Sequence, residues 1–180
     1  MMSQPLAERL RPKTLDDYIG QKHLVGQGAV LRKMIDAGRV PSFILWGPPG
    51  VGKTTLAQII ANKLDAPFYT LSAISSGVKD VREVIEKAKS NRFFNTVSPI
   101  LFIDEIHRFS KSQQDSLLNA VETGVVTLIG ATTENPSFEV IRPLLSRCQV
   151  YVLKSLDKND LLTLLHKAIA EDVVLKDKNI

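Results

Sequence analysis

Cysteine and long apolar runs are almost absent from this chain of 180 residues. Cys148 is its single cysteine, which excludes an internal disulfide and any cysteine-based zinc site and agrees with a reducing compartment. No apolar stretch approaches the ~18 residues of a membrane-spanning helix, and no apolar core of a secretory signal follows the charged segment 8–13. We therefore expect a cytoplasmic protein that does not cross a membrane.

A strong charge of one sign is also lacking. Lys and Arg number 23 against 19 Asp and Glu, and the net charge of +4 is compatible with nucleic-acid partners but ordinary for a soluble domain. Hydrophobic residues make up 44% of the chain. The chain can therefore bury a core as one α/β domain, with room for the beginning of a second.

The most informative segment present, residues 47–54, reads G-P-P-G-V-G-K-T and matches the phosphate-binding pattern G-x-x-x-x-G-K-[ST]. Its glycines let the backbone bend so that successive N–H groups cradle phosphates. Lys53 would contact the β- and γ-phosphates, and the Thr54 hydroxyl would bind a Mg²⁺ ion that bridges them. The predicted ligand is a nucleoside triphosphate, held by Gly47, Pro48, Pro49, Gly50, Val51, Gly52, Lys53, Thr54 and Thr55.

The flanks of this loop have the order that such a site needs. The apolar run 42–46 suits a buried parallel strand, and the helical pattern 53–64 would direct its positive end at the anion. The alternative is a glycine turn that only joins a strand to a helix.

Five short apolar runs predict strands, and helical patterns separate them. The runs are 43–46, 68–71, 100–103, 125–129 and 150–153, and the helices between later strands are predicted at 79–90 and 111–122. This alternation predicts a five-stranded parallel sheet flanked by helices. Residues 137–143 are expected to be a connecting loop.

The pattern changes after residue 154. Ser155 or Asp157 can cap a helix with a broad apolar stripe, and nothing follows in the sequence to cover that stripe. We therefore expect a nucleotide-binding α/β domain over residues 1–154 and the beginning of a truncated helical domain over 155–180.

Two carboxylates, Asp104 and Glu105, end the third apolar run. A parallel strand delivers such side chains to the carboxyl end of the sheet, where ligands bind in open α/β folds. Asp104 would hold Mg²⁺ together with Thr54, and Glu105 would orient and deprotonate the attacking water. Taken alone, an acidic pair after a strand is more often a solvated strand end.

The phosphate loop and this acidic pair together resemble the AAA+ superfamily of ring-forming P-loop ATPases. The resemblance implies ATP and Mg²⁺ as cofactors. It also implies that Thr133, in the polar residues that end the fourth predicted strand, senses the γ-phosphate. Arg147, in the motif S-R-C of residues 146–148, resembles an arginine that reaches the nucleotide of a neighbouring subunit. Without this context, Thr133 would be an ordinary strand end and Arg147 a surface residue.

The residues between the motifs narrow the resemblance to one family. Segments 102–109, 113–115 and 129–139 are similar to the family of replication-associated recombination protein A and its Werner-helicase-interacting relatives. Segment 9–21 also fits, and it implies that Tyr18 and Ile19 line the adenine pocket. The resemblance further implies a DNA-dependent ATPase at stalled replication forks. It would be nucleoid-associated, bound to single-stranded-DNA-binding protein and assembled as a homo-oligomer, commonly a tetramer, in a longer chain with a helical lid.

Candidate DNA contacts are less specific. Segment 75–82 opens a helix with free N–H groups and basic side chains, which suits phosphates, but a capped helix with a solvated face explains it equally simply. His107, Arg108 and Lys111 follow the acidic pair and are candidates to relay DNA binding to Glu105, with a packed or solvated His107 as the alternative. His23 and His166 have no partners at metal-ligand spacing and are interpreted as non-functional.

Three other functions fit parts of the pattern. A clamp-loader subunit and a Holliday-junction branch-migration ATPase share the S-R-C or A-T-T features, whereas segment 134–139 favours the recombination family. A regulatory protein that binds nucleotide as a switch is the alternative of a different class, and an intact Glu105 argues against it.

Overall fold

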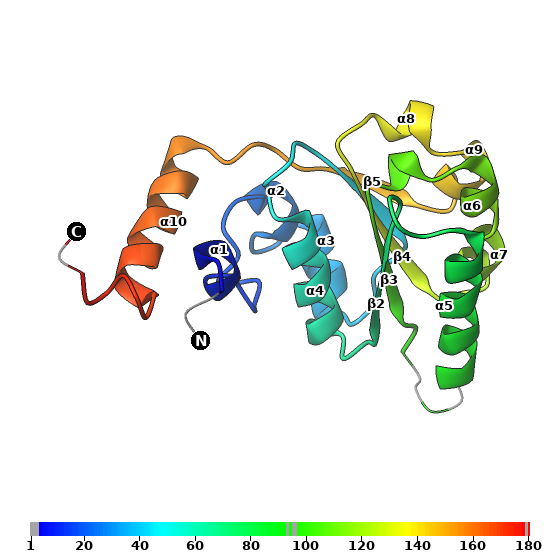
Figure 1. Ribbon diagram of the computed structural model, residues 1–180, viewed down its shortest axis with the longest axis horizontal. Helices are drawn as coiled ribbons and strands as arrows, with labels where there is room; N and C mark the ends of the chain where they lie inside the picture. The colour runs from blue at the N-terminus through cyan, green and yellow to red at the C-terminus, as the bar shows by residue number, and fades with distance from the viewer. Residues whose placement is uncertain (1–3, 93, 95–96, 179) are drawn as a thin grey trace.

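The computed structural model describes residues 4–92, 94, 97–178 and 180. Its centre is a parallel sheet of five strands in the order β2-β3-β4-β1-β5 (Figure 1). The strands are β1 Phe43–Trp46, β2 Phe68–Ser72, β3 Ile100–Asp104, β4 Thr127–Thr132 and β5 Gln149–Val152. The predicted α/β class and the five-stranded parallel sheet are therefore confirmed.

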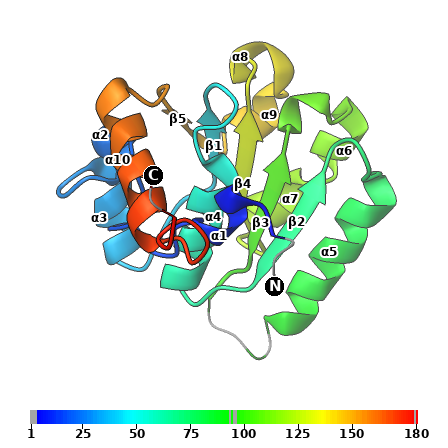
Figure 2. The ribbon, with the colours of Figure 1, turned by 60° about the vertical axis from the view of Figure 1, so that its left-hand side comes forward.

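Helices lie on both faces of the sheet (Figure 2). In chain order they are α1 Leu6–Arg9, α2 Lys22–Val25, α3 Val30–Asp36, α4 Lys53–Lys63, α5 Val78–Asn91, the 3-10 helix η1 Ile106–Arg108, α6 Lys111–Asp115, α7 Leu118–Glu122, α8 Pro136–Glu139, α9 Arg142–Leu145 and α10 Lys158–Glu171. None of these described helices is both long and apolar enough to cross a membrane.

Two cores explain why the central strands are apolar at nearly every position. Phe43 of β1 lies in a core with Leu56 of α4, whereas the next residue, Ile44, lies in a second core with Val81 of α5. Successive side chains of a strand point to opposite faces, so a sheet covered on both sides needs continuous apolar runs. Such burial stabilises the fold by about 1.5–3 kcal/mol for each large aliphatic side chain.

The register aligns the carboxyl ends of the central strands. Trp46, the last residue of β1, pairs with Thr132, the last residue of β4, and also with Val152 of β5. At the other side of β4, β3 runs parallel to it and ends at Asp104. The segments that follow β1, β3 and β4 therefore leave the sheet at one edge.

The predicted single helix 111–122 is wrong, because the structure divides it into α6 and α7. The Ser116 hydroxyl donates to the Gln113 carbonyl at 2.6 Å, and the Leu117 amide donates to Gln114, three residues back. Local side-chain bonds of this kind compete with the i to i−4 ladder of an α-helix. The chain continues from α6 into α7, but a bond to the residue three positions back replaces the α-helical bond at this point.

The fourth strand and the following loop also differ from the prediction. The amides of Val125 and Val126 bond to the Ala120 carbonyl and close α7, so the strand begins at Thr127 and not at 125, and it continues to Thr132. The expected loop 137–143 contains α8 and the start of α9. Each of these short helices has a proline in its first turn, where a missing N–H costs nothing.

The C-terminal helix α10 begins as predicted, with Asp157 as its cap. The Asp157 carboxylate accepts from the Asp160 amide at 2.7 Å, and the Asp160 carboxylate accepts from the Asp157 amide at 3.1 Å. The helix stands away from the sheet and beside the N-terminal helix α1 (Figure 1). Side chains of its apolar stripe are exposed by 39–60%, namely Leu161, Leu162, Leu165 and Ile169.

Candidate nucleotide-binding site

The glycine-rich loop joins β1 to α4, which begins at Lys53. Gly52 precedes the helix with a φ of +93°, and a Cβ there would lie 2.9 Å from the Tyr18 hydroxyl oxygen, so the position requires glycine. The Lys53 ammonium donates to the carbonyls of Gly47 at 2.6 Å and Pro48 at 2.9 Å. This ammonium therefore lies within the loop, at the helix terminus that attracts anions.

The loop opens into a cavity of about 520 Å³ at the carboxyl edge of the sheet. The lining comes from the loop, the acidic pair, the end of β4, the N-terminal segment and α10: Ala7, Leu10, Arg11, Pro12, Pro49, Gly50, Gly52, Lys53, Thr54, Thr55, Asp104, Glu105, Thr132, Thr133 and Leu164. The structure thus brings together nine predicted site residues: Pro49, Gly50, Gly52, Lys53, Thr54, Thr55, Asp104, Glu105 and Thr133.

The acidic pair turns sharply at the end of β3. Asp104 is exposed at the strand end, and its Oδ1 accepts from the Glu105 amide at 3.0 Å. Glu105 has a left-handed backbone, with a φ of +51°, which is uncommon for a residue with a side chain. Its carboxylate pairs with Nε of Arg108 at 3.4 Å.

The cavity couples the charge of Lys53 to that of Asp104. Burial lowers the pKa of the Lys53 ammonium, because desolvation disfavours its charged form, and the negative charge of Asp104 acts in the opposite direction. A cation and a carboxylate therefore lie close enough to influence each other where phosphates and a metal would need both.

A smaller cavity of about 110 Å³ adjoins the first and shares Leu10, Pro12, Gly50, Gly52, Thr55 and Leu164 with it. Tyr18 and Ile19, the residues expected to line the adenine pocket, line it together with Leu156 and Lys167 of the C-terminal segment. The Tyr18 hydroxyl donates to the carbonyls of Val51 and Gly52 at 3.0 and 3.1 Å. Burial raises the pKa of this phenol, which keeps it protonated as a donor.

Arg147 lies elsewhere. Among the residues that the structure describes, it is not part of either cavity lining. Its guanidinium donates to the Pro143 carbonyl at 2.6 Å and pairs with Glu122 at 3.2 Å. Burial raises the pKa of the adjacent Cys148 thiol to about 11, so this cysteine stays protonated.

The candidate DNA-binding segment 75–82 is a capped helix start. The Asp80 carboxylate accepts from the Gly77 amide at 2.6 Å, so one of the expected free N–H groups is occupied and a negative charge lies beside the others. This geometry favours the capped-helix alternative over a grip on phosphates. Lys79 pairs with Glu83 across an exposed face at 4.0 Å.

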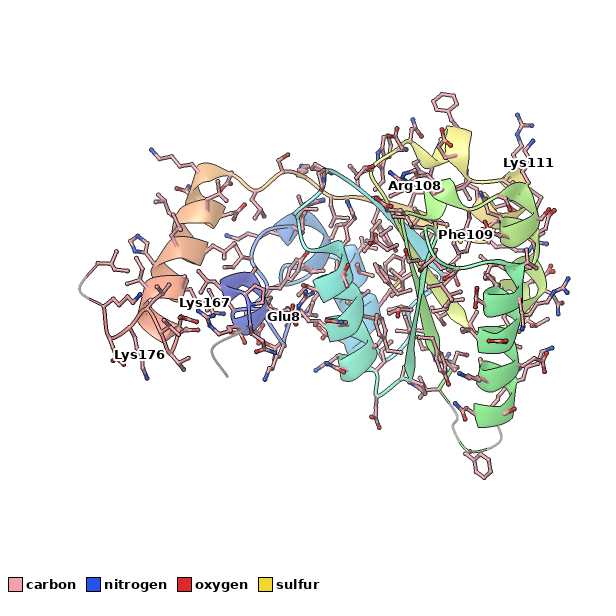
Figure 3. The ribbon with its side chains drawn as sticks, in the orientation of Figure 1. Glu8, Arg108, Phe109, Lys111, Lys167 and Lys176 are labelled. Atoms are coloured by element: carbon pink, nitrogen blue, oxygen red, sulfur yellow. The ribbon has the colours of Figure 1, made fainter. Side chains whose placement is uncertain are left out.

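The cations after the acidic pair lie on one side of the molecule, with Arg108 near the turn that follows β3 and Lys111 at the start of α6 (Figure 3). The His107 side chain is partly buried, and its Nδ1 lies 2.9 Å from the Thr132 hydroxyl. His23 bonds to the Val152 carbonyl at 2.8 Å, which is a structural contact, and His166 is exposed.

The residues present fit ATP and Mg²⁺. Gly50, Gly52 and Lys53 of the loop line the cavity, and Thr54 and Asp104 supply a hydroxyl and a carboxylate to the same lining. Mg²⁺ is usually bound by one or two such protein oxygens together with phosphates and waters. Among the described residues, no cluster of three or more His, Cys, Asp or Glu could hold a metal ion.

The structure adds site residues that local patterns do not identify. Arg11 lines the main cavity and donates to the Thr55 hydroxyl at 2.8 Å. Leu164 and Lys167 reach the smaller cavity from α10. The glycine loop and α10 are about a hundred residues apart, so no short motif connects them; the only sequence signal was the apolar stripe of the helix.

Comparison with known proteins agrees with this geometry. The family model described as "ATPase family associated with various cellular activities (AAA)" matches residues 43–156. "Replication-associated recombination protein A" of Escherichia coli is 51% identical over 97% of this chain, and the Haemophilus influenzae protein of the same name is 53% identical over 93%. "ATPase WRNIP1" of Dictyostelium discoideum is 50% identical over 98%. These relatives confirm the resemblance expected from the sequence.

The match covers only part of each relative. The chain spans 41% of the Escherichia coli protein, 37% of the Haemophilus influenzae protein and 20% of the Dictyostelium discoideum protein. Among solved structures, the "RuvB Holliday junction branch migration motor" of Thermotoga maritima has a TM-score of 0.72 at 32% identity, over 90% of this chain and 54% of that one.

Proposed function

Because this chain belongs to the AAA family of ATPases, we propose that it binds ATP with Mg²⁺ in the main cavity and hydrolyses it while acting on DNA at stalled replication forks, in recombination and repair. The observation that carries the proposal is one cavity shared by Lys53, Thr54, Asp104, Glu105 and Thr133. These side chains are of the types that bind a triphosphate, hold its metal and activate water.

Each of these residues has a role that its position supports. Lys53 and the loop amides would bind the phosphates, Thr54 and Asp104 would hold Mg²⁺, and Tyr18 and Ile19 would flank the adenine. When bound, Mg²⁺ supplies charge neutralisation at the phosphate oxygens. The Glu105 carboxylate would orient a water molecule and accept its proton, and Thr133 would donate a hydrogen bond to the γ-phosphate.

A DNA coupling is supported by the pair between Glu105 and Arg108. The Arg108 side chain is 56% exposed, so a DNA phosphate can compete for it, and Lys111 supplies a second cation on the same side (Figure 3). Release of this pair would free the Glu105 carboxylate, which already lines the cavity, from its competing cation. The names of the relatives, which refer to replication-associated recombination, support the DNA context.

Hydrolysis rates of the full-length protein with single-stranded, duplex, gapped and forked DNA test this function. We expect turnover that rises with DNA, most with forks, and that stops in Glu105→Gln while ATP binding persists. An unstimulated rate would contradict the fork assignment. Unchanged turnover in Glu105→Gln would exclude Glu105 as the base and favour the nucleotide-switch alternative.

We further propose a homo-oligomer, a tetramer in the full-length protein, in which Arg147 serves the nucleotide of a neighbouring subunit. The support is its position outside the cavities of its own chain. Arg147→Ala should lose turnover and keep ATP binding, and mixing it with Glu105→Gln subunits should restore part of the activity. No rescue at any mixing ratio would contradict the intersubunit role. A cytoplasmic, nucleoid-associated location and association with single-stranded-DNA-binding protein belong to the same proposal.

Branch migration of Holliday junctions is the second candidate, because the fold is similar to that of a solved branch-migration motor. Including a four-way junction among the DNA substrates separates the two functions. Preferential stimulation by the junction would favour the motor.

A further inference from the structure

Thr132 joins three parts of the nucleotide site. It is the last residue of β4, it is 1% exposed, and its carbonyl accepts from the amide of Gly47, the first residue of the phosphate loop, at 3.1 Å. Its hydroxyl accepts from the Glu134 amide at 2.9 Å, which closes a tight turn around Thr133. The same hydroxyl lies 2.9 Å from Nδ1 of His107.

His107 brings the acidic turn to this point. It lies in η1, two residues after Glu105, and η1 also packs on β4 through Ile106. There, Ile106 is fully buried so close to Gly130 that a Cβ at the glycine would lie 3.1 Å from its Cδ1. The contacts that hold the acidic turn against β4 therefore include the apolar packing of Ile106 and the side-chain hydrogen bond of His107.

This hydrogen bond matters because the ion pair that restrains the Glu105 carboxylate is weak. The Glu105 carboxylate pairs with a largely exposed Arg108 at 3.4 Å, and exposed pairs of this kind restrain geometry little. The bond from His107 is part-buried and ends on a hydroxyl that is held in place, because the Thr132 hydroxyl also bonds to the Glu134 amide at 2.9 Å and to the Glu134 carbonyl at 3.1 Å. The bond between His107 and Thr132 thus determines the distance between the acidic turn and Thr133, the next residue after Thr132.

We propose that His107 is a positioning residue: through Thr132 it sets the distance from Glu105 to Thr133 and to the start of the phosphate loop. This inference rests on the proposed ATP hydrolysis. It assigns to a histidine outside the cavity lining a role in turnover and none in nucleotide affinity, because water activation depends on sub-ångström placement whereas phosphate binding depends on the loop and Lys53.

The chemistry of the bond selects the informative variants. The hydroxyl can donate to Nδ1 or accept from it, so either tautomer of His107 keeps the bond. An asparagine places an amide nitrogen or oxygen about where Nδ1 stands and can play either part, whereas alanine removes it. At the other end, Thr132→Ser keeps the hydroxyl and Thr132→Val replaces it with a methyl group of similar size.

The experiment measures kcat, KM and the affinity for a fluorescent ATP analogue in the full-length protein with its stimulating DNA. We expect kcat to fall about 10- to 100-fold in His107→Ala and in Thr132→Val, with affinity within about twofold of wild type. His107→Asn and Thr132→Ser should recover kcat to within about threefold. The double variant His107→Ala/Thr132→Val should be no slower than Thr132→Val alone, because both remove one coupled contact.

His23→Ala is the matched control, since it removes a histidine hydrogen bond to the backbone of β5 away from the cavity. His23→Ala should leave kcat unchanged, because the hydrogen bond that it removes has only a structural role. Wild-type kcat in His107→Ala, a parallel loss of affinity, failure of the asparagine rescue or additive effects in the double variant would each overturn the proposal. Glu105→Gln separates the two levels: if it also keeps wild-type turnover, the proposed hydrolytic site itself is wrong.

Discussion

The main cavity has two walls that are built differently. The sheet wall consists of the phosphate loop, Asp104, Glu105 and Thr133, which follow strands that are buried on both faces. The outer wall, which continues into the smaller cavity, comes from residues within 7–12, 17–19 and 156–167, toward the two ends of the described chain and away from the sheet (Figure 1). The first wall holds the residues proposed to bind and hydrolyse ATP, and the second wall encloses them.

Their supports differ in kind. The sheet wall is held by backbone ladders and apolar burial, whereas side-chain polar bonds tie the outer wall in place. Gln21 exchanges two hydrogen bonds with the backbone of Lys154, at 2.7 and 2.9 Å, and Arg9 makes a two-point pair with Asp172 at 2.8 and 3.0 Å. Polar ties are directional and individually modest, so a wall held by them can adjust while the reacting groups stay fixed.

The largest expected effect is on the sheet wall. Lys53→Ala removes a preorganised cation from the phosphate loop, and we expect a loss of ATP turnover of about 100-fold or more. Steady-state hydrolysis measures it. Lys63→Ala is the matched control, because Lys63 is exposed at the far end of the same helix. A turnover of Lys53→Ala equal to that of the control would contradict the division between the walls.

An intermediate effect is expected where the walls meet. Gly52→Ala would force a left-handed backbone on alanine and place its Cβ 2.9 Å from the Tyr18 hydroxyl oxygen. We expect the free energy of unfolding to fall by about 1–3 kcal/mol, measured by urea titration, together with weaker ATP binding. Gly28→Ala is the control, because its φ is +79° and no atom lies within 4 Å of the new Cβ. Equal losses in both variants would show that the two walls do not touch here.

The smallest effect is expected in the outer wall and depends on pH. The hydrogen bonds from Arg9 lower the pKa of the Asp172 carboxyl from 3.8 to about 2. A lowered folded-state pKa stabilises the fold above the unfolded pKa, so this contribution is complete above about pH 4 and is lost as the pH falls toward 2.

Asp172→Asn tests this contribution by thermal unfolding across that range. It should lower the melting temperature at neutral pH, and the difference from wild type should shrink as the pH falls. Glu171→Gln, which removes an exposed partner of Lys167, should change little at any pH. A constant difference between Asp172→Asn and wild type would contradict the linkage.

Short motifs predicted most of the sheet wall, because each of its residues follows its own strand directly. Lys53, Asp104 and Thr133 could be assigned from spacing or resemblance, since parallel strands end at one edge whatever the loops between them do. Errors arose where local bonds competed with periodicity. The apolar pattern of residues 111–122 predicted one unbroken helix, but the bonds at Ser116 divide it. Prolines begin short helices in segment 137–143, which was expected to be a loop.

The sequence by itself determined the α/β class, the phosphate loop and the acidic pair, because strand burial and loop chemistry depend on residues that are neighbours in the sequence. Only the tertiary structure decided that Tyr18 meets Gly52, that Arg9 meets Asp172 and that His107 meets Thr132. These contacts join segments 25–163 residues apart, and they depend on how the layers pack around the sheet. The enclosing wall and the proposed positioning of Glu105 therefore depend on the fold.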